Sequence, residues 1–301
     1  MSHAFRTVGL WGRLEEPSVA DPARQIVAHL HKRGIRVLAA SEQAEGSRLR
    51  HVEAVPEGEL PERCDLIVAV GGDGTLLHAA RRAAARNLPL LGINRGRLGF
   101  LTDVLPDQML DAIDALLAGD YAAEQRSMLE ADLSPGADGP LRTLALNDVV
   151  LQKGETGRML DFVTYVDGIY VNTHGGDGLI VATPTGSTAY ALSCGGPIIQ
   201  PHVPALVMVP ICPHTLSDRP LVLPASVTIE VRVETGRDNP AHVVCDGERL
   251  GGIGADDVLR VRLATQTVTL LHPRGYNYYE LLRSKLNWGR TNRSGHPPRA
   301  G

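Results

Sequence analysis

Cysteine is scarce in this chain of 301 residues, and its distribution argues against two kinds of structural cross-link. The four cysteines, Cys64, Cys194, Cys212 and Cys245, are scattered and form no Cys-x-x-Cys pair. Structural zinc sites commonly use such closely spaced pairs, and secreted disulfide scaffolds use cysteine far more densely. The sequence therefore favours a reduced, cytoplasmic protein without a structural zinc site.

Long apolar runs and an excess of one charge are also missing. No stretch approaches the roughly 20 apolar residues that a membrane-spanning helix requires. The N-terminus lacks a basic region followed by an apolar run, so neither a membrane partner nor a signal peptide is expected. The net charge is −4, and neither sign collects in one half. We therefore expect no nucleic-acid partner, and phosphate ligands would be held by backbone amides and a few Arg or His side chains.

Strand and helix patterns alternate over residues 1–125. Apolar runs predict strands at Val8–Leu10, Ile35–Ala39, Leu66–Val70 and Leu90–Ile93. Helical periodicity predicts helices at Val19–Lys32, Leu76–Arg86 and Gln108–Ala118. This alternation is typical of a parallel sheet with right-handed crossovers. We therefore expect an α/β, Rossmann-like domain that carries a phosphate loop.

The pattern changes to β over residues 126–275. Asp167-Gly168 is a strong hairpin turn between extended runs. The predicted strands are Met159–Val166, Ile169–Asn172, Val227–Val233, His242–Cys245, Val258–Leu263 and Val268–Leu271. We expect an all-β, layered-sheet domain here. A helix at Tyr278–Leu286, within a segment 276–288, is expected to join the α/β domain, and the tail 290–301 to be disordered.

A glycine-rich loop, Gly71-Gly72-Asp73-Gly74-Thr75, follows a buried strand and opens a helix. Helix N-termini present free amides and partial positive charge that suit phosphate, and glycine lets the backbone approach a ligand. We expect Thr75 to cap the helix. A carboxylate in a phosphate cradle is unfavourable unless it acts, so Asp73 is a candidate to accept a proton, hold Mg²⁺ or bond a ribose hydroxyl. The alternative is a tight turn in which Asp73 satisfies local amides.

This loop differs from two common nucleotide-binding signatures. It has neither the Gly-Lys-Ser/Thr of a P-loop nor the Gly-x-Gly-x-x-Gly dinucleotide fingerprint. A hydride-transfer Rossmann enzyme is thus disfavoured. Open α/β sheets nevertheless bind ligands at the carboxyl ends of their strands, where this loop is expected to lie.

Three further stretches place polar residues at strand ends. Gly92–Asp103 follows the next predicted strand. Asn147-Asp148 supplies an amide and a carboxylate suited to adenine edges or ribose hydroxyls. In Asp177–Tyr190 an apolar strand runs into hydroxyls and glycine, followed by a predicted short helix at Ala189–Ser193 that can hold phosphate or ribose. Each stretch taken alone also fits an ordinary turn, connection or capped helix.

Together these four stretches resemble the NAD kinase family. The loop Gly71–Thr75 matches, as do Gly92–Asp103, Asn147-Asp148, Asp177–Ser193, Pro213–Leu216, Arg219–Leu221, Cys245–Gly247 and Leu271–Pro273. The likeness covers residues 60–288. It implies an N-terminal α/β domain and a C-terminal β domain with NAD between them.

The resemblance also implies a reaction and its participants. ATP would phosphorylate the 2′-hydroxyl of the adenosine ribose of NAD to give NADP, with a divalent metal cation, for which we expect Mg²⁺. No dedicated protein site for the metal is predicted. A homodimer or homotetramer is implied. The resemblance does not decide whether polyphosphate replaces ATP or which ligands regulate the enzyme.

Site residues carry over from the family at matching positions. The resemblance makes Asp73 the general base or orienting carboxylate, in a phosphate loop of Gly71, Gly72, Gly74 and Thr75. Asn147 and Asp148 would bind the adenosine part, and Asp177 the second half of NAD. The remaining expected NAD contacts are Gly74, His78, Arg158, Gly175, Thr188, Ala189, Tyr190, Ala191, Leu192, Ser193 and Glu248, the last at a position where the family often has an amide.

One position departs from the family. Gly175 stands where many similar members carry arginine, and the loss of that cation can alter the choice between NAD and NADH. The neighbouring His174 is a candidate to replace the charge in part. The preferred redox form of the substrate therefore stays open.

Two other functions compete with this interpretation. Lipid kinases that act on diacylglycerol or sphingoid bases, and phosphofructokinases, also use a Gly-Gly-Asp-Gly loop. They are not expected to share the run Thr183–Tyr190. A non-catalytic NAD-binding regulator is the second alternative, and the carboxylate of Asp73 in the phosphate loop argues against it.

Overall fold

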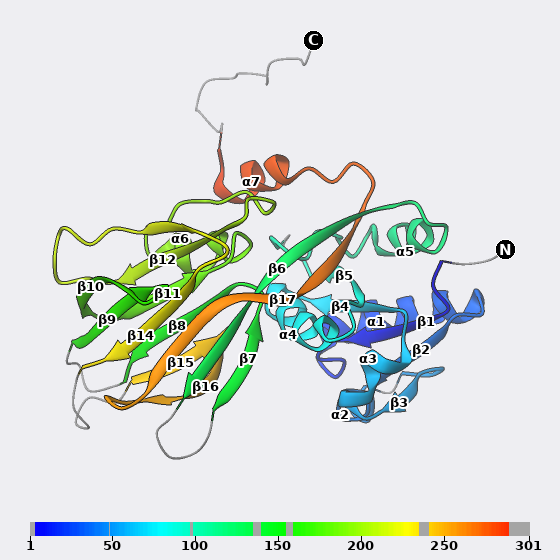
Figure 1. Ribbon diagram of the computed structural model, residues 1–301. Helices are drawn as coiled ribbons and strands as arrows, with labels where there is room; N and C mark the ends of the chain where they lie inside the picture. The colour runs from blue at the N-terminus through cyan, green and yellow to red at the C-terminus, as the bar shows by residue number, and fades with distance from the viewer. Residues whose placement is uncertain are drawn as a thin grey trace, which may run out of the picture.

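The computed structural model describes residues 4–47, 49–96, 99–134, 140–154, 159–234 and 241–288. Within these ranges the strands form an 11-stranded sheet and a 6-stranded sheet (Figure 1). None of the helices in this part of the chain is long and apolar enough to cross a membrane. The predicted tail 290–301 and Arg158 lie outside the described residues.

Five parallel strands form one end of the larger sheet, in the order β5-β4-β1-β2-β3. Their bounds are β1 Thr7–Trp11, β2 Arg36–Ala40, β3 Glu53–Val55, β4 Leu66–Gly71 and β5 Pro89–Asn94. The helices between them are α1 Pro17–Lys32, α2 Ser41–Ala44, α3 Leu60–Arg63 with a preceding 3-10 turn at Glu57–Glu59, and α4 Asp73–Ala84. A further helix, α5 Met109–Leu117, follows β5. The predicted α/β region is confirmed.

Alternate side chains of the parallel strands point to opposite faces of the sheet, and helices pack on both faces. Val68 packs with α1 and α5 in one buried cluster. Its neighbours Ile67 and Ala69 pack with α3 and α4 in another. Because the parallel strands are covered on both faces, their sequences are apolar throughout. This arrangement leaves the carboxyl ends of β4 and β5 open for polar loops.

The β region is a sandwich of two sheets. The smaller sheet has the order β13-β12-β11-β8-β15-β16 and packs against the antiparallel end of the larger one. The bounds are β7 Leu141–Ala145, β8 Asp148–Lys153, β9 Leu160–Val166, β10 Ile169–Gly176, β11 Gly178–Ala182, β12 Ala205–Ile211, β13 Leu221–Pro224, β14 Thr228–Val233, β15 Ala241–Cys245 and β16 Glu248–Ile253. The predicted layered-sheet class is confirmed.

Two long strands connect the two regions (Figure 1). They are β6, Tyr121–Ser134, and β17, Val258–Pro273, which pair with each other antiparallel over most of their length. The prediction of separate strands at Val258–Leu263 and Val268–Leu271 was wrong. A register shift between Leu263 and Thr267 absorbs the interruption, so one strand continues through it. Residue 125 lies inside β6, and the division into domains 1–125 and 126–275 stays a prediction.

The last described helix, α7, spans Tyr278–Leu286 as predicted. Asn277 caps it, since its side chain accepts hydrogen bonds from the amides of Tyr279 and Glu280. Lys285 Nζ lies 5.5 Å from the centre of the Phe100 ring. The helix therefore reaches the loop after β5.

Candidate active site

The phosphate loop joins β4 to α4. Gly72 is the N-cap of α4 and has no side-chain cap, so the expected cap at Thr75 was wrong. Thr75 lies in the first turn, where its side chain fills the space that a Cβ on Gly71 would occupy. By contrast, a Cβ on Gly72 or Gly74 would meet nothing within 4 Å. Gly71 is thus required by the fold itself, while Gly72 and Gly74 leave the backbone open to a ligand.

The carboxylate of Asp73 is held by the loop after β5. Its Oδ2 accepts a hydrogen bond from Phe100 N at 2.8 Å. Its Oδ1 accepts from Leu101 N at 3.1 Å, and from both Thr102 N at 3.1 Å and Thr102 Oγ1 at 3.0 Å. A Cβ on Gly99 would overlap Oδ1. The stretch Gly92–Asp103 therefore fixes the direction of Asp73, a role that its motif alone did not reveal.

Two arginines flank the phosphate loop. Arg13 and Arg95 line a cavity of about 210 Å³ together with Gly71, Gly72 and Gly74. Each guanidinium lies 2.9 Å from a different oxygen of Glu16. Sequence reasoning gave neither arginine a role. Arg95 follows β5 directly, and its place at a strand end was the available signal.

His78 and Glu248 come together from distant parts of the chain. His78 Nε2 lies 3.7 Å from Glu248 Oε1, and Arg81 forms an ion pair with the same oxygen. His78 and Glu248 both line a cavity of about 350 Å³, together with Gly74 and Thr75. Arg81 was missed, although its spacing of three from His78 puts both on one face of α4.

A half-buried aspartate shapes the Asn147-Asp148 turn. Asp246 accepts hydrogen bonds from the amides of Leu146 at 2.7 Å, Asn147 at 2.8 Å and Asp148 at 3.2 Å. Asp246 and Gly247 have φ angles of 48° and 84°, which make the tight turn between β15 and β16. The sequence comparison matched this stretch but assigned it no task. The Asp-Gly pair was itself a hairpin signal.

The polar side chains of this turn lack partners within the described residues. Asn147 Oδ1 is buried without a hydrogen bond. The carboxylate of Asp148 accepts none either, and burial, followed by the charge of Asp246, raises its pKa to about 7. Both residues line a cavity of about 500 Å³ with Leu77 and Tyr190. Unpaired polar groups in a cavity wall are suited to a polar ligand.

The hydroxyl-rich stretch forms a 3-10 turn, Gly186–Thr188, and the short helix α6, Tyr190–Ser193. Ala189 and Tyr190 line the same cavity as Asn147 and Asp148. The side chain of Ala191 is instead buried in the core. A Cβ on Gly186 would overlap the carbonyl of Asn147, so this turn packs directly under the polar pair.

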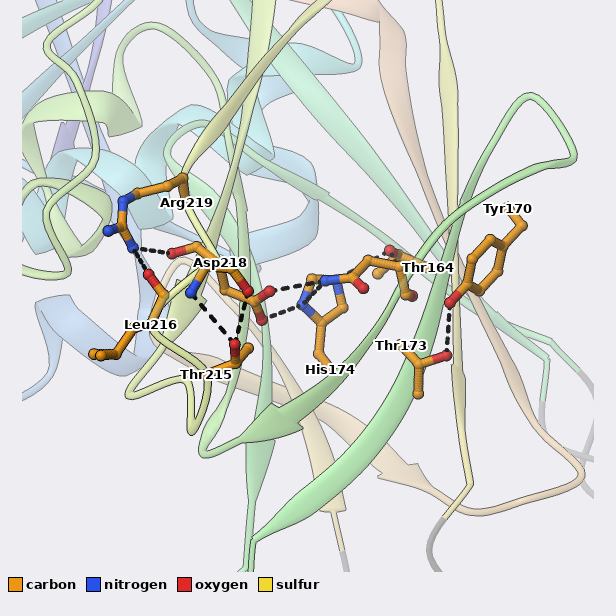
Figure 2. Close-up of polar contacts among 10 residues, drawn as sticks. Thr164, Tyr170, Thr173, His174, Thr215, Leu216, Asp218 and Arg219 are labelled. Carbon is orange, nitrogen blue, oxygen red and sulfur yellow. Dashed lines mark hydrogen bonds and ion pairs between the residues drawn. The ribbon is translucent and has the colours of Figure 1, made fainter.

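Asp177 and Gly175 lie near the β9–β10 hairpin, together with the histidine considered as a replacement cation. Asp177 Oδ1 contacts Lys153 Nζ at 2.6 Å. His174 is buried, with Nδ1 3.0 Å from Asp218 and Nε2 3.1 Å from Thr164 Oγ1. Figure 2 shows its ring held between these two side chains. His174 is therefore engaged by Asp218 and Thr164, and its part in replacing the cation that Gly175 lacks stays a prediction.

The two halves of the chain match two family models in succession. Residues 8–121 match the ATP-NAD kinase N-terminal domain, and residues 146–272 match the ATP-NAD kinase C-terminal domain. The NAD kinase of Nitrosococcus oceani is 43% identical over 290 residues, covering 96% of this chain and 99% of that protein. The chain belongs to the NAD kinase family. The NAD kinase of Aromatoleum aromaticum is 44% identical and covers 97% of each chain.

Solved structures agree with this membership in the NAD kinase family. The crystal structure of yeast NADH kinase complexed with NADH aligns with a TM-score of 0.88 at 26% identity, covering 97% of this chain and 90% of that one. An NAD kinase from Archaeoglobus fulgidus in complex with ATP aligns with a TM-score of 0.71 at 26% identity, covering 93% and 98%. The expected activity, phosphorylation of NAD to NADP with ATP, is confirmed, and the alternative activities on lipid or sugar acceptors are not supported.

Proposed function

We propose that NAD phosphorylation takes place between the Gly71–Thr75 loop and the Asn147-Asp148 turn, with Asp73 directed at the ribose 2′-hydroxyl. The observation that carries this proposal is the path of α4. The helix begins at Asp73, and one turn later Leu77 lines the cavity that contains Asn147 and Asp148. A dinucleotide in that cavity would therefore lie within reach of the phosphate loop.

The acceptor nucleotide would be held by the unpartnered groups of the cavity. Asn147 Oδ1 and the Asp148 carboxylate would take hydrogen bonds from the adenosine part, where they now have none. Tyr190 is 40% exposed and can stack on a ring of the substrate. Asp177, beside Lys153, would contact the second half of NAD.

The donor phosphates would lie over Gly72 and Gly74. Both positions leave the helix N-terminus open, and Arg13 and Arg95 provide positive charge at its edge. Phosphoryl transfer has a loose transition state, so alignment and charge neutralisation supply most of the acceleration. Asp73 needs only to orient the hydroxyl and accept its proton.

A divalent metal, which we propose to be Mg²⁺, would enter with ATP. Among the described residues no group of three or more His, Cys, Asp or Glu side chains is arranged to hold a metal. Mg²⁺ is commonly bound by substrate phosphates and water with few protein ligands, and we propose that mode for this chain. The ion would neutralise charge on the transferring phosphate, while the protein provides the loop amides and the arginines.

A homo-oligomer is supported by one edge of the larger sheet. β10 is the terminal strand, and its apolar residues Ile169 and Tyr170 are 71% and 56% exposed. Figure 1 shows β10 at the outer edge of the β region. Exposed apolar edge strands can pair with another chain.

The four free cysteines agree with the reducing cytoplasm that we propose as the location of this protein.

The decisive assay supplies the protein with ATP and Mg²⁺ and either NAD or NADH, and measures NADP and NADPH. We expect NADP in the NAD reaction and none without the metal. A parallel reaction with polyphosphate tests the donor. Binding of NAD without formation of NADP would overturn the proposal in favour of a binding protein.

A further inference from the structure

Charged side chains are buried where β6 and β17 pass between the two regions. Arg126 and His272 are each 2% exposed, and the side chains of Asp103 and Glu124 are 10% and 11% exposed. Glu124 and Arg126 are two residues apart on β6, so they face the same side of the sheet. Charges buried this deeply are unfavourable unless they are paired.

These four residues form a continuous chain of contacts. His272 Nδ1 lies 2.7 Å from Asp103 Oδ2, and Nε2 lies 3.3 Å from Glu124 Oε2. Arg126 Nη2 lies 2.7 Å from the same Glu124 oxygen. On the far side, Arg126 Nη1 donates to Thr185 Oγ1 at 3.3 Å. His272, Glu124 and Arg126 thus link an acidic residue of one loop to a hydroxyl of another.

The two ends of this chain adjoin the two halves of the proposed site. Asp103 directly follows the threonine whose amide and hydroxyl donate to Asp73. Thr185 directly precedes Gly186, which packs against the carbonyl of Asn147. The network therefore spans from the loop that orients Asp73 to the turn that supports Asn147.

Several atoms of the cluster have no partner within the described residues. The ring of Tyr276 stacks on His272 at 3.9 Å, yet its hydroxyl is buried and unpaired. Asp103 Oδ1, Arg126 Nε and His272 Nε2 also lack a hydrogen-bond partner, so His272 Nε2 meets Glu124 as an ion pair at 3.3 Å and not as a hydrogen bond. Unsatisfied buried polar groups reduce stability unless internal water reaches them.

We propose that His272 is a positioning residue for phosphoryl transfer, and that it fixes the separation of the Asp73 loop from the Asn147 turn. This inference rests on the roles proposed above for Asp73 and Asn147. A displacement of about 1 Å in a reacting group can lower the rate about 100-fold. A buried contact that fixes the distance between the two loops can therefore have a large effect on kcat.

The carboxylates on either side of His272 shift the pKa values of the cluster. Burial by itself lowers the pKa of His272, but the neighbouring carboxylates of Asp103 and Glu124 outweigh it and raise that pKa. Burial acts to raise the pKa of Glu124, yet His272 and Arg126 bring it down to about 2. A carboxylate on each side of the imidazole ring holds it against displacement.

The test uses two partial replacements of the histidine in the full chain. His272→Asn retains a donor near the Nδ1 position, toward Asp103, and His272→Gln retains one near Nε2, toward Glu124. We expect each to lower kcat at least about tenfold, with KM for NAD and ATP changed less than about threefold. Amide hydrogen exchange at Phe100–Thr102 should accelerate in His272→Gln but not in His272→Asn.

Two further variants guard against a merely structural effect. Thr185→Val cuts the far end of the network, and we expect a similar loss in kcat with unchanged exchange at Phe100–Thr102. Leu259→Ala removes packing on the same strand, away from the network, and should leave kcat per folded molecule unchanged. The inference is overturned if His272→Asn and His272→Gln keep kcat within about twofold of wild type while Asp73→Asn does not. Full turnover in Asp73→Asn would instead refute the proposed function.

Discussion

The carboxylates of Asp73 and Asp148 lie on the two sides of the proposed site and differ in how they are held. Asp73 accepts hydrogen bonds from three backbone amides and one hydroxyl. Asp148 accepts none among the described residues, and its pKa is raised to about 7, by burial first and then by Asp246. One group has its direction fixed in advance, and the other has an unsatisfied capacity to bind.

This difference indicates a division of labour. A fixed carboxylate suits chemistry, because alignment is then complete before the substrate arrives. An unpaired carboxylate suits recognition, since a ligand that satisfies it gains affinity and an analogue that cannot is rejected. We therefore expect substitutions at Asp73 to act on kcat and those at Asp148 to act on binding and on pH dependence.

The largest effect is expected for Asp73→Asn. Loss of the proton acceptor should lower kcat at least about 100-fold. The new amide nitrogen cannot accept from the loop donor that faces it, so we expect stability to fall by about 1–3 kcal/mol. Steady-state kinetics and urea unfolding measure the two effects. Asp148→Asn is the matched control and should chiefly raise KM for NAD. Wild-type turnover in Asp73→Asn would remove this residue from the chemistry.

The next effect concerns pH and Asp148. Because its pKa is raised from an ordinary 3.8 to about 7, the folded state keeps a proton that the unfolded state loses. Stability should therefore fall as pH rises from about 4 to about 7. A full shift corresponds to about 4 kcal/mol, and since water in the cavity screens part of it, we expect about 2 kcal/mol.

Urea unfolding at several pH values tests this sign. Asp148→Asn should lose the decline, so its stability relative to wild type should improve as pH rises. An identical pH dependence in both proteins would show that Asp148 is not the group responsible.

A smaller effect is expected for Gly99→Ala. The new methyl group would overlap Asp73 Oδ1 and displace the carboxylate from its loop. We expect kcat to fall about tenfold, a modest share of what a 1 Å misplacement can cause. Gly58→Ala, where a Cβ meets nothing within 4 Å, is the control. Unchanged kcat in Gly99→Ala would mean that this loop does not set the position of Asp73.

The smallest effect is expected for Gly74→Ala, which should raise both the stability of the protein and KM for ATP. A Cβ there meets no atom within 4 Å and the residue lies in α4, so Gly74→Ala should stabilise the protein by about 0.5–1 kcal/mol. If phosphate approaches this backbone, KM for ATP should nonetheless rise several-fold. Thermal unfolding and ATP titration measure both. A more stable variant with unaltered KM would place the donor elsewhere.

Local patterns predicted much of the fold. The alternation of strand and helix gave the parallel region, and the bounds predicted for the last helix, Tyr278–Leu286, match α7. The continuity of β17 was missed, because the residues between Leu263 and Thr267 have the polar character of a loop, and their pairing with β6 cannot be read from the sequence of β17. A register shift is a property of the strand pair and cannot be predicted from either strand alone.

The site was predictable in its parts and less so in its connections. The motifs located Asp73, Asn147 and Asp148, because glycine and polar residues at strand ends follow from simple rules. The support that Asp246 gives from about 100 residues away follows only from the fold. His174 shows the converse, since its sequence neighbours could not reveal that Asp218 and Thr164 bury it.

The most direct test of the account is a crystal structure of Asp73→Asn with NAD, Mg²⁺ and a non-hydrolysable ATP analogue. We predict that the 2′-hydroxyl oxygen of the adenosine ribose lies within hydrogen-bond distance of the side chain at position 73. The terminal phosphate of the analogue should lie on the other side of that hydroxyl. A ribose bound out of reach of residue 73, with the two nucleotides in separate places, would contradict it.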